Sequence, residues 1–220
     1  MKNVVLLSLI MVSIVAFSSC HKNRIKGEGS VISDTRSIGK IKYVEADGDL
    51  EVEILPAEKN RVVVTGYQNL VPAFETEVSH ERLVLKFNDT YYNVKNNNIR
   101  VTLYVNDING ITLNGSGKVI MRSDVNTDNM ELKINGSGKI TLEDNYAPTL
   151  SCHINGSGNM FCRSFEADNV HANISGSGGM ELTANKYLQT RISGSGTIDY
   201  WGNPETVNND ISGSGKVRKH

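Results

Sequence analysis

Hydrophobic and polar residues alternate with a period of two along most of the chain after residue 40. Ile99, Val101, Leu103 and Val105 form one unbroken example, with polar or aromatic residues between them. Alternation of this kind is typical of a β-strand with one buried face. Shorter stretches of the same kind lie at residues 41–54, 61–66, 74–78 and 82–87. No segment after the leader shows the 3.6-residue period of an amphipathic helix, so the pattern predicts an all-β protein.

From residue 107 onwards the alternation is interrupted at regular intervals by the tripeptide Gly-Ser-Gly, which occurs six times. The first glycines of the copies are 21, 20, 20, 18 and 19 residues apart. A fixed period near 20 residues indicates a repeat architecture, in which each unit buries its apolar face against its neighbours. The glycines predicted to form structural corners are Gly115, Gly117, Gly136, Gly138, Gly156, Gly158, Gly176, Gly178, Gly194, Gly196, Gly213 and Gly215.

Alignment of the copies on their first glycine shows where the apolar residues lie. Ile or Leu stands two places before the glycine in every copy, and Val, Ile or Met stands four places after it. Stacked about 4.8 Å apart, such columns form ladders inside a narrow core, and glycine permits the sharp corner between them. The repeats predict a parallel β-helix with three faces and about 20 residues per coil. An antiparallel hairpin array, closed into a sandwich or barrel, is the alternative.

The residues before the regular repeats carry three expectations. Residues 20–37 are polar and are predicted as a tether or linker, so that the folded domain spans residues 38–220. The sequence around Gly48 has the shape of a degenerate first corner. Residues 88–98 are predicted to form a projecting loop, whose Tyr91 and Tyr92 are candidate binding residues. A solvated excursion without a ligand is the simpler interpretation of that loop.

The C-terminal segment contains the only tryptophan, Trp201, followed by Pro204. We expect these two residues to close the end of the solenoid, where the ladders would otherwise meet water. The basic residues in 216–220 discourage end-to-end stacking of molecules.

The N-terminal sequence is typical of an export signal. An apolar run too short for a comfortable membrane span follows Lys2 and ends in Ser18-Ser19-Cys20. Small residues just before a cysteine resemble a bacterial lipoprotein signal, so residues 1–19 are predicted as a signal peptide and Cys20 as the lipidated residue. The alternative is a signal cut near Ser19 with an incidental cysteine. The expected location is the cell envelope, anchored to a membrane by lipid, on the periplasmic face or the surface.

Two further cysteines, Cys152 and Cys162, form an even pair that invites a disulfide in an exported protein. Both fall in columns whose other members are mostly Leu, Ile, Ala or Met. The register therefore favours two small buried apolar side chains. A bridge across the core stays open, because the two residues lie on opposite sides of one corner.

Neither the composition nor the motifs indicate a nucleic-acid, phosphate, metal or catalytic site. The formal net charge of −1 provides no field that favours nucleic acid. Gly-Ser-Gly-Lys at residues 115–118 and 136–139 lacks the remaining residues of a phosphate-binding loop. The corners hold no acidic residues for calcium, and Asp47, Asp49 and Glu51 are better explained as a solvated turn. Neither the scattered carboxylates nor the five histidines show catalytic or metal spacing, so no cofactor, metal or catalytic residue is predicted.

The repeated Ile-(Asn/Ser)-Gly-Ser-Gly, the Tyr-Trp-Gly-Asn-Pro segment before the last copy, and the lipoprotein-like leader together resemble the auto-transporter adhesin "head GIN" domain family of the Bacteroidota. The resemblance covers residues 38–217. It implies a right-handed, three-sided parallel β-helix, and it brings no catalytic residues and no established function.

The expected function is that of a non-catalytic envelope lipoprotein with an adhesion or binding role towards a glycan or an envelope protein. A structural subunit of an envelope complex is the alternative. A carbohydrate-active enzyme on the same scaffold is less favoured, because that chemistry needs paired carboxylates. The pattern leaves the oligomeric state open.

Overall fold

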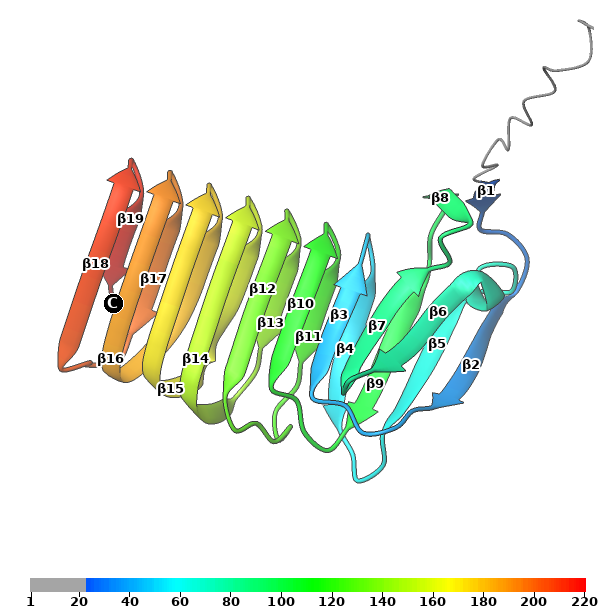
Figure 1. The fold of residues 1–220 in the computed structure, drawn as a ribbon, viewed down its shortest axis with the longest axis horizontal. Coiled ribbons are helices and arrows are strands. Elements are labelled where there is room, and N and C mark those ends of the chain that lie inside the picture. The colour runs from blue at the N-terminus through cyan, green and yellow to red at the C-terminus, as the bar shows by residue number, and fades with distance from the viewer. Residues whose placement is uncertain (1–22) are drawn as a thin grey trace, which may run out of the picture.

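The described part of the chain, residues 23–220, winds into a parallel β-helix of about six turns with roughly 20 residues per coil in the computed structural model (Figure 1). One continuous sheet contains 17 strands. The chain rises along the near strands and descends along the far ones as it advances towards the C-terminus, which makes the solenoid right-handed (Figure 1). The predicted β-helix is confirmed, and the alternative of a hairpin sandwich or barrel is wrong.

Each coil has two long walls that meet at the Gly-Ser-Gly corner. The pre-corner sheet contains β10 (Gly110–Gly115), β12 (Met130–Gly136), β18 (Thr206–Gly213) and the second halves of β14 (Asn145–Gly156), β15 (Asn159–Gly176) and β16 (Gly179–Gly194). The post-corner sheet contains β11 (Lys118–Met121), β13 (Lys139–Leu142), β17 (Thr197–Trp201), β19 (Lys216–Lys219) and the first halves of β15 and β16. Neighbouring strands in both walls are parallel and in register.

The core consists of the ladders that the alignment predicts. The column two places before the glycine is fully buried through Leu113, Ile134, Ile154, Ile174 and Ile192. The facing column, from Val119 to Ile198, is buried in the same way. Each such side chain contributes roughly 1.5–3 kcal/mol when removed from water. Cys152 and Cys162 are free and completely buried in the next inward columns, four places before and six places after Gly156.

The corner itself requires glycine. The first glycine of every repeat has a φ between +117° and +134°, where other residues are strained. The amide of the serine then donates to the carbonyl of the preceding coil's glycine, for example Ser137 N to Gly115 O at 3.0 Å. Beside this ridge, Asn114, Asn135 and Asn155 form an amide ladder with N–O distances of 2.8 and 3.0 Å. Backbone and side-chain amide hydrogen bonds therefore connect each corner to the corner of the next coil.

The far end of each coil is less regular. Residues 122–129 and 202–205 form loops, whereas β15 and β16 continue as strand around the bend, where β14 pairs with β15 and β15 pairs with β16. A short third face therefore exists only in the later coils. Phe165 is buried there, Tyr187 is half-buried and Tyr146 is 47% exposed. Of the three aromatic residues at this bend, only Phe165 belongs fully to the core.

The degenerate corner at Gly48 belongs to a coil made of β3 (Tyr43–Asp47) and β4 (Glu51–Pro56). These strands pair in register with β10 and β11, which places this coil directly before the regular stack. Gly48 has a φ of +98°. The first copy thus folds as the later ones do.

One more coil lies outside that one, although it comes later in the chain. After β5 (Arg61–Tyr67), η1 (Val71–Ala73) and β6 (Phe74–Ser79), the chain forms β7 (Arg82–Phe87) and β9 (Arg100–Val105). These two strands pair in parallel with β3 and β4. The order of coils in space therefore differs from their order in the sequence, and the chain passes the β3–β4 coil again to reach β10.

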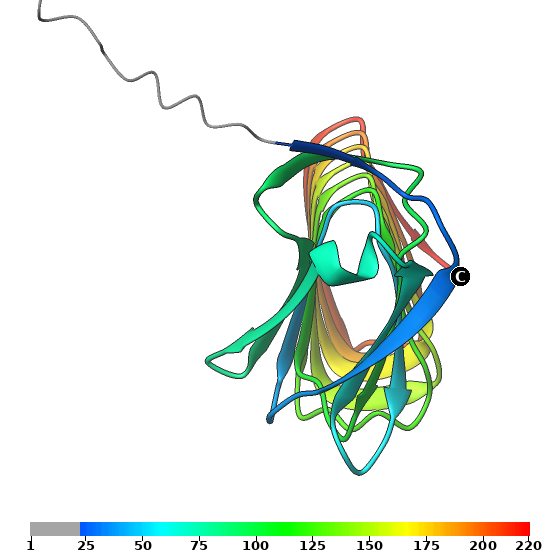
Figure 2. The same cartoon turned by 90° about the vertical axis from the view of Figure 1, so that its right-hand side faces the viewer.

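Antiparallel strands cover the outermost coil. β2 (Val31–Ser37) pairs with β5, β5 pairs with β9, and β6 pairs with β7. η1 crosses the end of the solenoid at which the cap lies, as Figure 2 shows in a view of that end. Arg36 of β2 connects this strand to η1 and β6, because its guanidinium donates hydrogen bonds to the carbonyls of Val71 and Phe74 at 2.9 and 2.7 Å. We call this unit, β2 and β5 to β9 with η1, the N-terminal cap.

Two predictions for this region are wrong. The described part of the predicted linker forms β1 (Asn23–Lys26) and β2. β2 forms because the edge of β5 offers unpaired backbone groups that β2 satisfies. The predicted loop at residues 88–98 contains β8 (Tyr91–Lys95), which pairs in parallel with β1. The signal peptide and the lipidation site Cys20 lie outside the described residues.

The C-terminal end of the solenoid is open. Every residue of β18 is exposed, including Val207 and Ile211. Trp201 lies on the outer side of the last turns, stacked between the Arg163 guanidinium at 4.5 Å and the His220 ring at 4.7 Å. The expectation that Trp201 closes the end is therefore wrong. Its position next to the inward-facing Tyr200 points it outwards by strand alternation.

Candidate functional site: a polar groove beside the N-terminal cap

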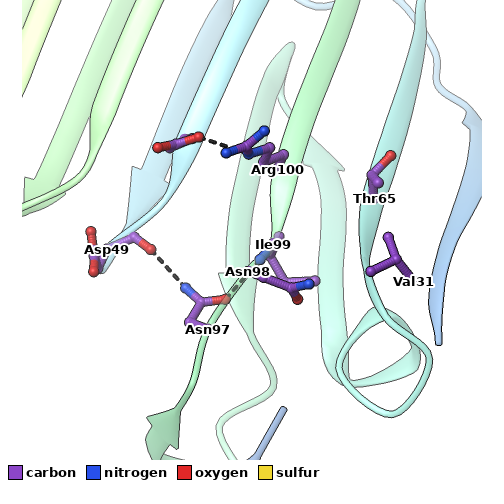
Figure 3. Close-up of a pocket in the computed structure, with 8 residues that line it drawn as sticks. Val31, Asp49, Thr65, Asn97, Asn98, Ile99 and Arg100 are labelled. Carbon is purple, nitrogen blue, oxygen red and sulfur yellow. Dashed lines mark hydrogen bonds and ion pairs between the residues drawn. The ribbon is translucent and has the colours of Figure 1, made fainter. Parts of the chain in front are cut away.

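One hollow in the described surface lies where the cap meets the first coils. Its volume is about 420 Å³, and side chains from the β3–β4 turn, β2, β5 and the start of β9 surround it (Figure 3). The lining residues are Val31, Asp49, Glu51, Thr65, Asn97, Asn98, Ile99 and Arg100. We call this hollow the cap groove.

Asparagine side chains build the floor of the cap groove. Asn97 Nδ2 donates to the carbonyl of Asp49 at 2.7 Å, and its Oδ1 accepts from the amide of Ile99 at 3.0 Å. Asn98 Oδ1 accepts from the amide of Tyr67 at 2.8 Å. The outermost coil has no Gly-Ser-Gly corner, so these amides satisfy the backbone groups that the corner would have satisfied.

Charged and hydroxyl groups form the walls of the cap groove. Arg100 Nε lies 2.9 Å from Glu51 Oε2, across directly paired positions of β9 and β4. Both side chains are more than 60% exposed. Thr65 shares a hydrogen bond of 2.8 Å with Ser33. The groove therefore offers donors and acceptors together, on strands that hold them at fixed spacing.

A second hollow of about 240 Å³ continues from the cap groove along the post-corner sheet. Arg122 occupies its far end, where the guanidinium bonds Glu53 at 2.7 Å and also contacts Glu143. These hydrogen bonds with Glu53 and then Glu143 raise the pKa of Arg122. The two hollows together give a polar path across the outer face of three coils.

The predicted candidate residues lie elsewhere. Tyr91 lines a different cavity, of about 340 Å³, together with Asn69, Asn88 and Thr90. The side chain of Tyr92 lies outside the described part of the structure. The corner glycines form a ridge along the solenoid rather than a pocket.

The other carboxylates and histidines do not converge. Asp168 bonds Lys186 at 2.7 Å, and Asp199 bonds Arg218 and His220 at 2.8 and 2.7 Å. Among residues 23–220, no group of three or more His, Cys, Asp or Glu side chains is placed to hold a metal ion. In the same range, no helix is long and apolar enough to cross a membrane.

Sequence reasoning missed most of the cap groove, since Thr65, Arg100 and Val31 come from segments that only the fold brings together. One signal was available. The run Asn96-Asn97-Asn98 breaks the alternation immediately before a strong strand, and amide side chains often stand where the backbone turns sharply.

The family model described as "Putative auto-transporter adhesin, head GIN domain" matches residues 41–164 and 146–204. No curated protein matches the chain. Several solved structures share the fold. A putative adhesin from Bacteroides fragilis NCTC 9343 has a TM-score of 0.74 at 20% identity, over 89% of this chain and 100% of that one.

Two structures from Parabacteroides are also similar. One, from Parabacteroides distasonis ATCC 8503, is described as a putative lipid binding protein; it has a TM-score of 0.61 at 21% identity, over 90% of this chain and 100% of that one. The other, a putative adhesin from Parabacteroides merdae ATCC 43184, has a TM-score of 0.57 at 17% identity, over 90% and 99%. At these identities the likeness concerns the fold.

Proposed function

Because the chain belongs to the putative auto-transporter adhesin, head GIN domain family, we propose that it is a non-catalytic envelope lipoprotein that binds a glycan in the cap groove. Family membership indicates an adhesion-like role and an envelope or surface location. The single observation that carries the choice of ligand is the chemistry of the groove. It mixes carboxylate, amide, hydroxyl and guanidinium groups on strands and on the turns between them.

A glycan suits this lining because each sugar hydroxyl both donates and accepts a hydrogen bond. Asp49 and Glu51 accept, Arg100 and the Asn98 amide donate, and Thr65 does both. A large apolar ligand would leave those groups unpaired, which costs about 1–3 kcal/mol for each buried group. A flat sheet edge would bind a peptide through its backbone, whereas the cap groove presents side chains.

Lipidation of Cys20 would bring the cap groove close to the membrane. Only two residues separate Cys20 from β1, and an extended chain spans at most about 3.6 Å per residue. The cap, rather than the open C-terminal end, would then face the bilayer. A Cys20→Ala variant should lose lipid labelling and appear in the soluble fraction, and an unchanged membrane fraction would contradict the anchor.

Glycan binding is tested with a panel of envelope polysaccharide fragments and the variants Asp49→Asn and Arg100→Gln. Both changes should weaken binding about 5- to 30-fold each, the value of one charge-assisted hydrogen bond. The Arg100–Glu51 pair is exposed, so its loss should cost less than about 1 kcal/mol of stability. Lys186→Gln, a matched loss of a surface charge far from the groove, should leave binding unchanged. Absence of binding to every fragment would contradict the proposal.

The open C-terminal end favours a second candidate function, that of a subunit in an envelope assembly. β18 and β19 each pair on one side only, and Ile211 is 42% exposed at the unpaired edge. Such an edge can accept another strand. Light scattering with the intact chain tests it: a monomer at all concentrations, together with no partner after cross-linking in cells, would exclude this function.

A further inference from the structure

Another hollow, of about 340 Å³, lies on the pre-corner sheet, on the opposite wall from the path that leaves the cap groove. Its polar lining consists of Lys133, His153, Asn155, Asn173, Ser175 and Arg191. Strand register arranges four of these in one row, because Lys133 pairs with His153, His153 with Asn173, and Asn173 with Arg191. We call this hollow the basic row.

The shape of the basic row follows from side-chain length. Lys133 and Arg191 are long and stand at its two ends, while the shorter His153 and Asn173 lie between them. Coils about 4.8 Å apart put these ends roughly 14 Å from each other along the solenoid axis. Asn155 and Ser175, from the neighbouring column of the same face, form one side. The hollow is therefore elongated along the axis.

The electrostatics of the basic row differ from those of the cap groove. None of the residues that line it is a carboxylate, whereas Asp49 and Glu51 line the cap groove. Lys133 pairs with Glu131 at 2.6 Å, and Arg191 pairs with Asp210 at 3.0 Å, both outside the lining. Exposed pairs of this kind are worth about 0–1 kcal/mol, so an incoming anion can replace them at little cost.

His153 occupies the middle of the row, where its surroundings disfavour the charged imidazolium. Asn173 Nδ2 lies 3.3 Å from His153 Nδ1, which suits donation to an unprotonated nitrogen. Burial lowers the pKa of His153, and the charges of Lys133 and His171 lower it further, whereas Glu131 opposes them. Arg191 adds positive charge from β16. A bound anion would offset this repulsion and favour the imidazolium.

We propose that the basic row binds the carboxylate groups of an extended acidic glycan that lies along the solenoid axis. Coil spacing near 4.8 Å is close to the length of one sugar unit, so successive coils can contact successive sugars. Lys133 and Arg191 pair with carboxylates, and Asn155 and Ser175 bond hydroxyl groups. This site is separate from the cap groove and does not depend on the ligand proposed there.

Proton linkage gives the site a signature that simple charge attraction lacks. A ligand that favours imidazolium raises the pKa of His153, so binding takes up protons and strengthens as the pH falls. Carboxyl groups of uronic acids stay ionised above about pH 5, like other carboxyl groups with pKa values near 3.5. The pH dependence between 5.5 and 7.5 therefore reports on the protein.

The test is calorimetric titration of the intact protein with oligogalacturonate, at pH 5.5 and 7.5 and one ionic strength. A neutral malto-oligosaccharide of the same length is the control ligand. We expect binding of the acidic oligosaccharide alone, about 3- to 10-fold tighter at pH 5.5. Lys133→Gln and Arg191→Gln should each weaken it about 5- to 10-fold. Lys139→Gln, an equal charge loss on the opposite wall, should leave it unchanged.

Three further measurements separate this site from its alternatives. His153→Gln should abolish the pH dependence, and in the parent protein the pKa of His153 measured by NMR should rise when oligogalacturonate is added. Arg100→Gln, in the cap groove, should leave this binding unchanged. The proposal is overturned by lack of binding at both pH values, by equal loss in Lys139→Gln, by pH dependence that persists in His153→Gln, or by loss of binding in Arg100→Gln.

Discussion

The regular coils and the N-terminal cap are built from the same alternating strands, yet they are specified in different ways. In the coils from β10 to β19, each strand pairs with the strand one repeat away, at a spacing of 18 to 21 residues. In the cap, β7 and β9 pair in parallel with β3 and β4 of the neighbouring coil, while β2 and β6 are antiparallel to their partners.

This difference shows where the local sequence is sufficient to specify which strands pair. A repeat that carries its own corner needs only a neighbour of the same kind, so its pairing follows from its period. The cap has no such period. Its strands find partners by covering the last exposed edge and the end of the core, which depends on segments up to about 70 residues apart. The cap also holds the cap groove, while the regular walls hold the basic row.

The largest expected effect on the free energy of unfolding comes from replacing a glycine at a stacked corner, compared with the same change at the degenerate corner. In Gly156→Ala the new Cβ would overlap the carbonyl of Gly136, at a φ of +130°. In Gly48→Ala only the positive φ is a problem, since nothing lies within 4 Å of the added atom. We expect a loss of at least about 4 kcal/mol for the first and about 1–2 kcal/mol for the second. Urea unfolding measures both, and equal losses would show that stacking does not constrain the corner.

The next effect tests whether the cap opens apart from the coils. Arg36→Ala removes hydrogen bonds to the carbonyls of Val71 and Phe74, from a side chain that is only 21% exposed. We expect a loss of about 2–3 kcal/mol, because a charged donor leaves two acceptors unpaired. Hydrogen exchange should accelerate in β2, β5 and β6 and stay unchanged in β14 to β16. Uniform acceleration along the chain would mean that cap and coils unfold as one unit.

A smaller effect concerns the column beside the corner. Asn135→Ala breaks the amide ladder on both sides, since Asn135 donates to Asn114 and accepts from Asn155. We expect a loss of about 1 kcal/mol, or 2–4 °C in melting temperature. Ser193→Ala, in the same column, should change the melting temperature by less than about 1 °C. If both variants melt alike, the amide ladder does not stabilise the stack.

The smallest effect is expected at the open end and depends on pH. Burial raises the pKa of Asp199, but hydrogen bonds from Arg218 and His220 outweigh it, so the pKa is lowered overall. A carboxyl with a lowered pKa in the folded state stabilises above its unfolded value of about 3.9, and that contribution disappears as the pH falls through the folded value. Asp199→Asn should therefore reduce the acid sensitivity of unfolding below about pH 4. An unchanged acid limb would contradict this contribution.

The two regions also differ in how far the sequence predicted them. The repeats predicted the inward columns that contain Ile134 and Ile154, and the structure buries both residues. The same reasoning predicted a linker where β2 lies and a loop where β8 lies. Both segments are polar enough to resemble loops. β2 becomes a strand because the edge of β5 is available, whereas β8 pairs with β1 in a separate two-stranded sheet.

The candidate sites divide along the same line. The basic row could be deduced from the repeat, because alignment places Lys133, His153, Asn173 and Arg191 in one column. The cap groove could not be deduced, because Val31, Thr65 and Arg100 share no period and meet only after β2, β5 and β9 have paired.

By itself the sequence determined the coil: its length, its corner, its inward ladders and the outward columns, because a 20-residue repeat stacked in register has few ways to bury its apolar faces. Only the tertiary structure decided the order of the first coils, the covering of one end and the exposure of the other. Those features depend on backbone groups left unpaired at the ends of the stack, and such groups are satisfied by whichever segment can reach them.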